Sequence, residues 1–324
     1  MSNNIKNLNK VLIIGSGYMA KEYAKVLKSL GVEFEVVGRG KMNCKKIEDE
    51  FSIKVHSGGL ESFLLKNEMF KYSHIINTVN VNFLHNTTKL LIKFGAKRIL
   101  LEKPGDIYVA GLQNISDLSK KKGCEVLIAY NRRFYSSVNE LKNLSKKDGG
   151  ILSMHFEFTE WIHTINEEDY DKDTLKKWII GNSSHVIDTA LYLIGDIKYL
   201  NSNVAGKSVI PWHPSGSIFT GSGASTNNIP FTYHANWLSS GRWSIEVMTS
   251  KKKYYLKPME QLFEQKIGSI EIKKLKIKDD YDVKFKPGIY QQTINFIDNK
   301  NEKFCSLNQQ IKNIKEIYNI IGNY

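Results

Sequence analysis

A glycine-rich turn near residue 15 is the feature that most constrains the fold of this chain. The segment Val11-Leu12-Ile13-Ile14-Gly15-Ser16-Gly17-Tyr18-Met19-Ala20 places the spacing GxGxxA directly after an apolar run. Gly15 permits a tight turn, Gly17 lets the backbone approach a pyrophosphate, and the small Ala20 allows close helix–strand packing. The anion would lie at the positive N-terminus of the following helix. The pattern therefore predicts a dinucleotide site that includes Gly15, Ser16, Gly17, Tyr18 and Met19.

The first 130 residues alternate short β-branched runs with segments of helical period. Such alternation is typical of parallel strands joined by helical crossovers. Between the first two runs, Ala20, Tyr23, Ala24 and Leu27 recur at helical spacing, as expected for a helix that packs on a sheet. We predict a Rossmann domain over residues 1–130, a doubly wound parallel sheet with strands at residues 10–15, 33–37, 53–55, 74–78, 98–102 and 125–129.

The end of the second predicted strand bears on the choice of nicotinamide cofactor. The strand ends Val36-Val37-Gly38-Arg39-Gly40-Lys41, without a carboxylate where an acidic side chain usually binds the ribose hydroxyls of NAD, and Glu35 lies too early. The guanidinium of Arg39, helped by Lys41, would meet the 2′-phosphate of NADP and stack on adenine. We expect NADP(H) to be favoured over NAD(H). The alternative is an exposed Arg39 beside a pocket that accepts NAD.

The pattern changes near residue 150, where a Gly-Gly turn precedes a long strand candidate with interleaved polar residues. We predict a C-terminal α+β domain over residues 131–324, built on a large, mostly antiparallel sheet and serving substrate binding and oligomerisation. Its expected elements are strands at residues 151–161, 232–238, 243–249 and 253–256, a helix at 183–194, irregular loops at 201–230, edge strands at 265–286 and a terminal helix at 308–321. An alternative for the terminal helix is that it packs against the first domain.

The segment Leu101-Glu102-Lys103-Pro104 follows the fifth predicted strand. Ligands of Rossmann domains bind outside the carboxyl ends of the strands, so Lys103 would emerge where nicotinamide meets substrate. Here the chain resembles the Gfo/Idh/MocA family of sugar and inositol oxidoreductases, whose Glu-Lys-Pro motif supplies an active-site lysine. Asn77-Thr78-Val79-Asn80 and Asn131-Arg132-Arg133-Phe134 resemble the same family. The resemblance implies cofactor contacts from Thr78, Asn80, Glu102 and Lys103.

In the second predicted domain, the residues Gly181-Asn182-Ser183-Ser184-His185-Val186-Ile187-Asp188 look like that family's glycine-rich HxxD helix start. Helical spacing sets an apolar stripe against a polar stripe of His185, Asp188, Thr189 and Tyr192 that would face a cleft. Many family members carry Asp four residues before the histidine, where this chain has Gly181. Either Asn182 or a residue between His163 and Asp173 substitutes for it, or the chemistry is altered or lost.

The resemblance implies hydride transfer between nicotinamide and a secondary alcohol or ketone, with Lys103 and His185 as the catalytic residues. A neutral imidazole at His185 is suited to take the hydroxyl proton, and the Lys103 ammonium would stabilise the same oxygen. Aromatic faces and guanidinium groups would shape a sugar site, whereas Asp188 would be structural. The candidate substrate residues are Arg132, Arg133, Trp161, Trp178, Asn182, Trp237 and Arg242.

The implied substrate is a sugar, an inositol or a nucleotide-linked sugar, the last of which would place the reaction in surface-polysaccharide biosynthesis. The resemblance also implies a homodimer or homotetramer. A second possibility on the same fold is a catalytically silent, dinucleotide- or sugar-binding regulatory protein, which Gly181 makes conceivable.

Composition bears on nucleic-acid binding, metal binding and membrane contact. The net charge of +13 comes mostly from Lys spread along the chain, which favours a solvated surface or attraction of anionic substrates over nucleic-acid binding. The eight His and three Cys lack the spacing of a metal site. The segment Met1–Lys10 is polar, and no apolar stretch approaches the length of a membrane span. We therefore expect a cytoplasmic protein that contacts no membrane and holds no metal.

Overall fold

The computed structural model of the protein describes residues 10–324. The polar start of the chain contributed to the expectation of a cytoplasmic protein, and its residues 1–9 lie outside the described part. The described chain forms two compact units, which are treated separately below. Unit 1 contains the residues up to Asn131 and Val283–Lys312, and unit 2 contains Arg132–Asp282 and Asn313–Tyr324. The sequence-based division kept residues 131–324 in one piece, whereas here residues 283–312 group with the first unit.

Unit 1 is built on a seven-stranded sheet of order β15-β6-β5-β4-β1-β2-β3. The first six strands along the chain pair in parallel, and the short β15 runs antiparallel to β6. This confirms the expected doubly wound parallel sheet. The strands are β1 (Lys10–Ile14), β2 (Phe34–Val37), β3 (Val55–His56), β4 (Tyr72–Asn77), β5 (Arg98–Glu102), β6 (Glu125–Ala129) and β15 (Cys305–Ser306).

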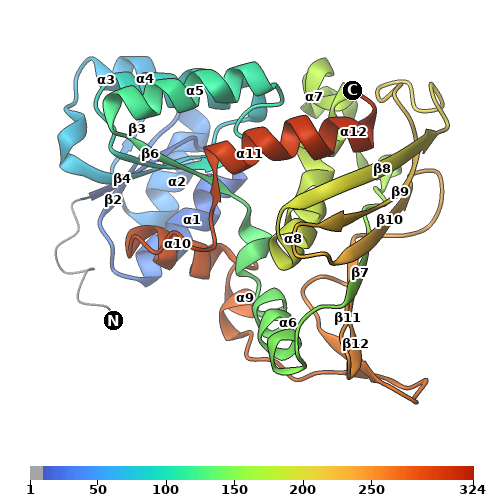
Figure 1. Ribbon diagram of the computed structural model, residues 1–324. Coiled ribbons are helices and arrows are strands. Elements are labelled where there is room, and N and C mark those ends of the chain that lie inside the picture. Colours follow the sequence, from blue (N-terminus) through green and yellow to red (C-terminus); the bar gives the residue numbers. More distant parts are fainter. Residues whose placement is uncertain (1–9) are drawn as a thin grey trace. The chain divides into compact units, whose positions relative to one another are not determined.

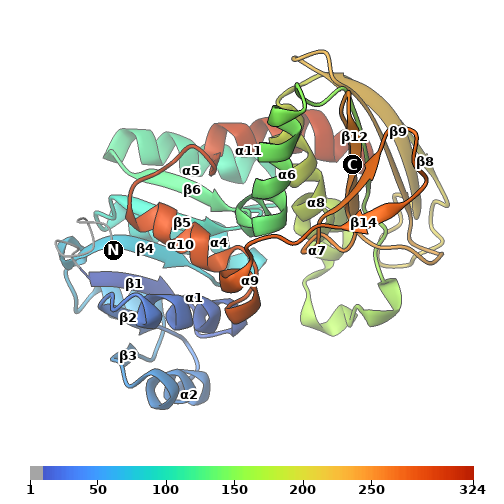
Figure 2. The same ribbon diagram turned by 90° about the horizontal axis from the view of Figure 1, so that it is seen from below.

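Continuous aliphatic runs form the central strands of this sheet because both faces are covered by helices. Leu12, Ile76 and Leu100, one from each of three adjacent strands, are fully buried. Helices α4 and α5 lie side by side on one face, and α1 contacts α2 and α10 on the other (Figures 1 and 2). The helices are α1 (Tyr18–Ser29), α2 (Lys41–Phe51), α3 (Leu60–Leu64), α4 (Val81–Lys93), α5 (Val109–Lys122), α10 (Ile289–Ile297) and α11 (Leu307–Asn313).

Unit 2 is built on an eight-stranded sheet of order β14-β13-β12-β11-β7-β10-β9-β8. Only β7 and β10 pair in parallel, so the sheet is mostly antiparallel, as predicted. In β10, buried Phe231, Tyr233 and Ala235 alternate with exposed residues, so one face packs on the core. The strands are β7 (Ser153–Glu157), β8 (Ile197–Ala205), β9 (Ile218–Ser225), β10 (Pro230–Asn236), β11 (Ser244–Met248), β12 (Lys252–Leu256), β13 (Phe263–Lys266) and β14 (Ile272–Lys274).

Helix α8 (Ser184–Ile194) covers the packed face of this sheet through contacts with β7 and β11. One π-helical turn, Ile179–Ser183, leads directly into it. Further helical elements that include unit 2 residues are α6 (Ser136–Lys147), α7 (Lys172–Lys176), α9 (Asp280–Lys284), the π-helical Ile314–Tyr318, α12 (Asn319–Gly322) and three short 3-10 turns at Asn131–Phe134, Ile162–Thr164 and Glu167–Asp169. The predicted terminal helix is present from Leu307 to Gly322, and its residues divide between the units after Lys312.

Two regions differ from the sequence-based expectation. Residues 201–230, expected to be irregular, contain the end of β8 and all of β9. The glycines of β9 make room for aromatic rings, because a Cβ at Gly221 would overlap the ring of Tyr233 and one at Gly223 the ring of Phe231 on the paired strand. Residues 265–286, expected to be edge strands, hold β13 and β14 but end in helix α9. No helix among residues 10–324 is long and apolar enough to span a membrane.

Candidate functional site

The loop between β1 and α1 is held tightly against the end of β4. Gly15 adopts a φ of 110°, and a Cβ there would lie 2.7 Å from the Thr78 Oγ1. The backbone N–H and the hydroxyl of Thr78 both donate to the Ile14 carbonyl, at 2.8 and 2.9 Å. Only glycine satisfies both the backbone conformation and this close approach. The first glycine of the GxGxxA motif therefore fixes the turn.

The N-terminus of α1 is open toward this loop. Gly17 is the N-cap residue and has no side chain to cap the helix, and the first turn carries no acidic residue. A Cβ at Gly17 would meet no atom within 4 Å, so the space beside it is empty. Uncapped amide donors and the helix dipole at such an end suit a phosphate group.

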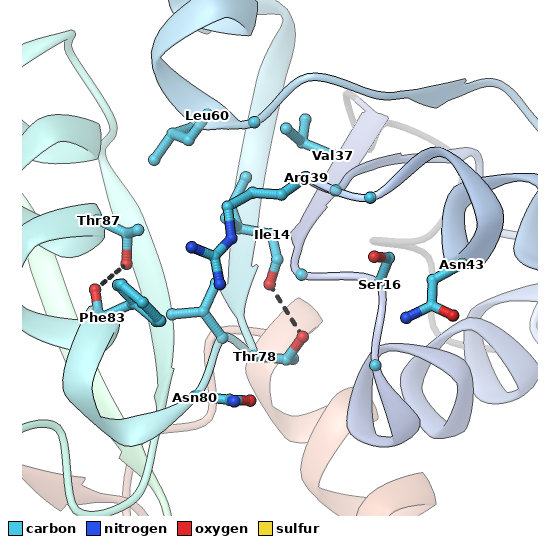
Figure 3. A pocket seen from close by; sticks show the side chains of 16 residues that line it. Ile14, Ser16, Val37, Arg39, Asn43, Leu60, Thr78, Asn80, Phe83 and Thr87 are labelled. Atoms are coloured by element: carbon cyan, nitrogen blue, oxygen red, sulfur yellow. Dashed lines mark hydrogen bonds between the residues drawn. The ribbon is translucent and has the colours of Figure 1, made fainter. Parts of the chain in front are cut away.

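A pocket of about 300 Å³ opens at this end of the sheet (Figure 3). It receives residues from the loops after β1, β2 and β4 and from α4, and none of its lining residues is an Asp or Glu. Of the predicted cofactor residues, Gly15, Ser16, Gly17, Arg39, Thr78 and Asn80 line it. The remaining lining residues are Ile14, Val37, Gly38, Gly40, Asn43, Gly59, Leu60, Val79, Phe83 and Thr87.

Arg39 projects into the pocket toward Phe83 (Figure 3), and its guanidinium carbon lies 4.2 Å from the centre of that ring. The cation–π contact holds the guanidinium in place before any ligand arrives. At Gly38, the residue before Arg39, a Cβ would overlap the side chains of Ser16 and Cys44, so the acidic side chain that NAD-binding domains often carry at this strand end would require both to move. Lys41, which we expected to help Arg39, is not among the lining residues.

Glu35 is engaged elsewhere, in agreement with its position inside β2. Its carboxylate accepts hydrogen bonds from Tyr72 at 2.7 Å and Lys10 at 3.0 Å, and lies 2.6 Å from His56 Nε2. Burial acts to raise the pKa of Glu35, but these partners outweigh it and lower the pKa to about 2. Glu35 is therefore a structural anion of unit 1.

Four predicted cofactor residues do not line the pocket: Tyr18, Met19, Glu102 and Lys103. The Tyr18 ring is exposed, with the Lys286 ammonium 5.1 Å from its centre. Lys103 is partly buried and follows the end of β5, the end at which ligands of parallel sheets bind. Pro104 is fixed by α11, since Gln310 donates to the Pro104 carbonyl at 3.0 Å and to the Tyr130 hydroxyl at 3.1 Å.

Glu102 belongs to a buried network under the lysine. The Tyr23 hydroxyl lies 3.0 Å from its carboxylate and 2.8 Å from the Gln292 Oε1. Desolvation raises the pKa of Glu102 to about 7, against the opposing influence of Lys103 and Tyr23. The Glu102 carboxyl, next to Lys103 in the chain, therefore changes charge near neutral pH. Glu102 does not line the pocket.

In unit 2, His185 lies in the first turn of α8. Its ring centre is 5.9 Å from that of Trp243, which precedes β11. The polar stripe predicted for this helix is not a solvated face, because Asp188 and Thr189 are fully buried. The expectation that all four stripe residues face a cleft is therefore wrong for these two.

A carboxylate missed by the sequence analysis lies at the start of the same helix. Glu160, in the segment after β7, is only 2% exposed and accepts hydrogen bonds from Asn182 Nδ2 at 3.1 and 3.2 Å and from Ser183 Oγ at 2.6 Å. A Cβ at Gly181, where the resemblance led us to look for Asp, would lie 3.1 Å from the Thr174 methyl carbon, so a side chain there would require Thr174 to shift slightly. Asn182, predicted as a substitute for that Asp, is a donor to Glu160.

Two predicted substrate residues are instead part of the core of unit 2. Arg133 forms a buried bidentate ion pair with Asp188, with Nε to Oδ2 and Nη2 to Oδ1 both at 2.7 Å. These two guanidinium nitrogens are therefore not available to bind a phosphate. Trp178 is 3% exposed and packs edge-on against Tyr170 and Trp212. Trp237, also considered for the sugar site, is 2% exposed.

The other predicted substrate residues gather around one indole. Arg132 and Arg242 place their guanidinium carbons 4.5 and 4.7 Å from the centre of the Trp243 ring. Arg242 also stacks on Trp161 at 4.5 Å, and its Nη1 lies 3.6 Å from the Glu160 carboxylate. Trp161 is 46% exposed, so this cluster reaches the surface.

Sequence reasoning missed three residues of these sites: Phe83, Glu160 and Trp243. Phe83 had a detectable signal, because it lies three residues after Asn80 at the start of a helix that follows a strand end. Glu160 lay within the predicted strand over residues 151–161, whereas β7 ends at Glu157 and leaves it in the connection to α7. Trp243 carried no motif.

The comparisons with known proteins agree with this geometry. A family model described as pyridine nucleotide-disulphide oxidoreductase matches residues 10–57, which contain β1, α1, β2, α2 and β3. Glucose-6-phosphate 3-dehydrogenase from Bacillus subtilis (strain 168) is 28% identical over 197 residues. That match covers 60% of this chain and only 54% of the relative, so about half of the relative's length is matched.

Solved structures match almost the whole chain. An oxidoreductase from Agrobacterium radiobacter in complex with NAD+, L-tartaric acid and magnesium has a TM-score of 0.77, with 13% identity over 97% of this chain and 96% of that one. UDP-N-acetylglucosamine 3-dehydrogenase from Acidithiobacillus ferrooxidans has a TM-score of 0.72, with 10% identity over 97% of both chains. At these identities the likeness concerns the fold. The chain shares the two-sheet fold of these solved oxidoreductases, with one parallel and one mostly antiparallel sheet, as the sequence led us to expect.

Proposed function

We propose that this protein is an NAD(P)-dependent oxidoreductase that transfers hydride between nicotinamide and a secondary alcohol or ketone of a sugar. The observation that carries the proposal is the pocket after β1: an uncapped helix N-terminus, empty space beside Gly17, and a lining without carboxylates. These features fit a pyrophosphate-linked dinucleotide. The similarity to glucose-6-phosphate 3-dehydrogenase supports a sugar as the substrate.

The proposed cofactor is NADP(H) in preference to NAD(H). Arg39 is the only side chain with a formal charge among the pocket's lining residues, and Phe83 holds it toward the cavity. A guanidinium forms strong, bidentate hydrogen bonds to a phosphate, whereas ribose hydroxyls are better bound by a carboxylate. A side chain at Gly38 would displace Ser16 and Cys44, which supports the same preference.

Lys103 and His185 are the proposed catalytic residues. The bound nicotinamide supplies the hydride acceptor or donor. Lys103 would donate a hydrogen bond through its ammonium to the reacting oxygen and stabilise its negative charge. His185 would accept the hydroxyl proton at a ring nitrogen during oxidation and return it during reduction.

The substrate residues that we retain are Arg132, Trp161, Arg242 and, through Glu160, Asn182. We do not retain Arg133 or Trp178, since the first is paired with Asp188 and the second is enclosed by aromatic rings. A nucleotide-linked sugar of surface-polysaccharide biosynthesis is one proposed substrate. We further propose that the protein works in the cytoplasm as a homodimer or homotetramer, for which light scattering of the eluted protein is the direct measurement.

The test is turnover, followed as absorbance of reduced nicotinamide, with NADP+ and a panel of glucose 6-phosphate, UDP-N-acetylglucosamine and myo-inositol. With a substrate found, Lys103→Met and His185→Gln are each expected to lower kcat by about 100-fold or more while NADPH affinity is kept. Lys121→Met and His234→Gln, at exposed positions of α5 and β10, are the matched controls. Cofactor binding with no turnover of any sugar or inositol would favour the regulatory protein instead.

A further inference from the structure

Several buried side-chain donors of unit 2 have no hydrogen-bond partner among residues 10–324, and two of them lie in the cluster around Trp243: Nε of Arg132 and Nε1 of Trp243 itself. The Arg132 guanidinium carbon lies 4.5 Å from the Trp243 ring centre, so both donors belong to the same cluster. Buried donors of native proteins are nearly always paired, so an acceptor bound at this cluster would satisfy both of them.

The cluster also carries an excess of positive charge. Arg132 has no carboxylate within 4 Å in the described part of the chain, and the only one so near Arg242 is Glu160, at 3.6 Å. Glu160 is already the acceptor for Asn182 and Ser183. Burial, with a contribution from Arg242, lowers the pKa of Arg132 against the opposing influence of Tyr135, Glu260 and Glu160. A guanidinium remains protonated nonetheless, so a partly buried cation that contacts no carboxylate of residues 10–324 carries an energetic cost that a bound anion would offset.

The cluster is positioned for a substrate group. Trp243 contacts both guanidinium groups and also the His185 ring. The ring centres of Trp243 and His185 are 5.9 Å apart. The Arg242 side chain is 40% exposed and stacks on the half-exposed Trp161, so the surface side is open to solvent.

We propose that Arg132, Arg242 and Trp243 form a subsite for an oxyanion group of the sugar substrate, either a phosphate ester or a carboxylate. Arg132 Nε and Trp243 Nε1 would each donate a hydrogen bond to its oxygens, and Arg242 would close over it from the exposed side. The substrate class is thereby an anionic sugar whose charged group is held beside His185. The link to turnover rests on the proposed function, whereas the binding itself does not.

The test is a calorimetric titration of the full chain, without nicotinamide, using glucose 6-phosphate, glucuronate and glucose as probes. We expect at least one charged sugar to bind about tenfold more tightly than glucose, as charge-assisted hydrogen bonds require. Arg242→Gln is expected to remove that preference, and Arg132→Lys, which keeps the charge but loses the Nε donor, to reduce it. Lys207→Gln, the loss of one positive charge at an exposed turn of the same unit, should keep it.

The two charged probes separate the sources of the oxyanion, since a phosphate subsite selects glucose 6-phosphate and a carboxylate subsite selects glucuronate. Equal binding of charged and neutral sugars, no binding of either charged sugar at millimolar concentration, or an equal loss in Lys207→Gln would overturn the proposal. A parallel NADPH titration keeps the two proposals distinct. Charged-sugar binding without NADPH binding contradicts the oxidoreductase alone, and the reverse contradicts the subsite alone.

Discussion

Arg133 and Asp188 form a bidentate ion pair inside unit 2, with both nitrogen–oxygen distances at 2.7 Å and the carboxylate fully buried. The pair ties the segment after β6 to the middle of α8, the helix that carries His185. Arg133→Met should lower the free energy of unfolding by about 3 to 5 kcal/mol, because it leaves a buried carboxylate without its cation. Urea denaturation of the variant and the wild type measures this difference.

The double variant Arg133→Met/Asp188→Leu is the control for this pair, since replacing both charges by apolar groups should recover most of the lost stability. If Arg133 were a phosphate ligand instead, Arg133→Met would weaken ligand binding and leave the urea midpoint unchanged. That outcome would restore the role that sequence reasoning gave it.

Gly15 and Gly17 predict opposite consequences for the same substitution. Gly15→Ala should destabilise the protein by about 1 to 3 kcal/mol, because a φ of 110° and the approach of Thr78 both exclude a side chain. Gly17→Ala should leave the melting temperature unchanged, since its φ of −92° is ordinary and its Cβ meets no atom within 4 Å. It should nevertheless weaken NADPH binding by about tenfold, because the methyl group occupies the space of the pyrophosphate. Unchanged affinity in folded Gly17→Ala would exclude this loop from the cofactor site.

Glu102 predicts a pH dependence of stability in the neutral range. Burial raises its pKa from 4.5 to about 7, so between these values the folded protein keeps a proton that the unfolded chain has released. The contribution of Glu102 to stability therefore falls as the pH rises from about 4.5 to about 7 and is constant above that. Glu102→Gln should remove this slope from a series of urea midpoints, whereas Glu61→Gln, at an exposed position of the same unit, should retain it. A difference in urea midpoint between the wild type and Glu102→Gln that stays constant from about pH 4.5 to about pH 7 would contradict the assignment.

His213 predicts a loss of stability in acid. Its Nδ1 donates to the Gly216 carbonyl at 2.8 Å, so its Nε2 must accept the hydrogen bond of the Tyr324 hydroxyl, at 2.6 Å. Burial lowers the pKa of His213 to about 4, and the unfolded histidine therefore takes up a proton first as the pH falls from about 6.5. Stability should decrease between these values.

The measurement for His213 is the melting temperature across this pH range. His213→Gln should flatten part of the decrease and leave the remainder, because buried His74 of unit 1 has its pKa lowered to about 4 in the same way. An identical pH profile in the variant would show that His213 does not contribute.

The fold of unit 1 was predictable because its chemistry is local. Continuous aliphatic runs bounded by turns identify the central strands of a parallel sheet, and the GxGxxA spacing orders the first of them. The return of residues 283–312 to this unit was not predictable, because α10 and β15 are short and depend on contacts with α1 and β6 that are distant in sequence.

In unit 2, composition gave the wrong signal for β9. Its Gly and Ser residues are typical of loops, yet Gly221 and Gly223 serve as cross-strand partners of Tyr233 and Phe231. A glycine that accommodates a neighbouring ring cannot be told from a turn glycine without knowing the pairing.

Some residues of the two candidate sites were predictable from the sequence and others were not. Arg39 was found from its place at the end of β2, because strand ends fix where a Rossmann ligand lies. The burial of Arg133 and Trp178 was not predictable, since the sequence does not distinguish a residue that contacts a ligand from one that contacts another side chain, whereas the structural role expected for Asp188 agrees with its buried pairing. Glu160 was missed because its partners Asn182 and Ser183 are brought to it only by the fold.

The most direct test of the account is a calorimetric titration of the protein with NADPH and, separately, with NADH. We predict that NADPH binds about tenfold more tightly than NADH or better, and that Arg39→Ala reduces NADPH to the level of NADH. Lys41→Ala, the neighbouring cation outside the pocket lining, should keep most of the preference. A folded sample that binds neither nucleotide would contradict the dinucleotide site and with it the proposed oxidoreductase.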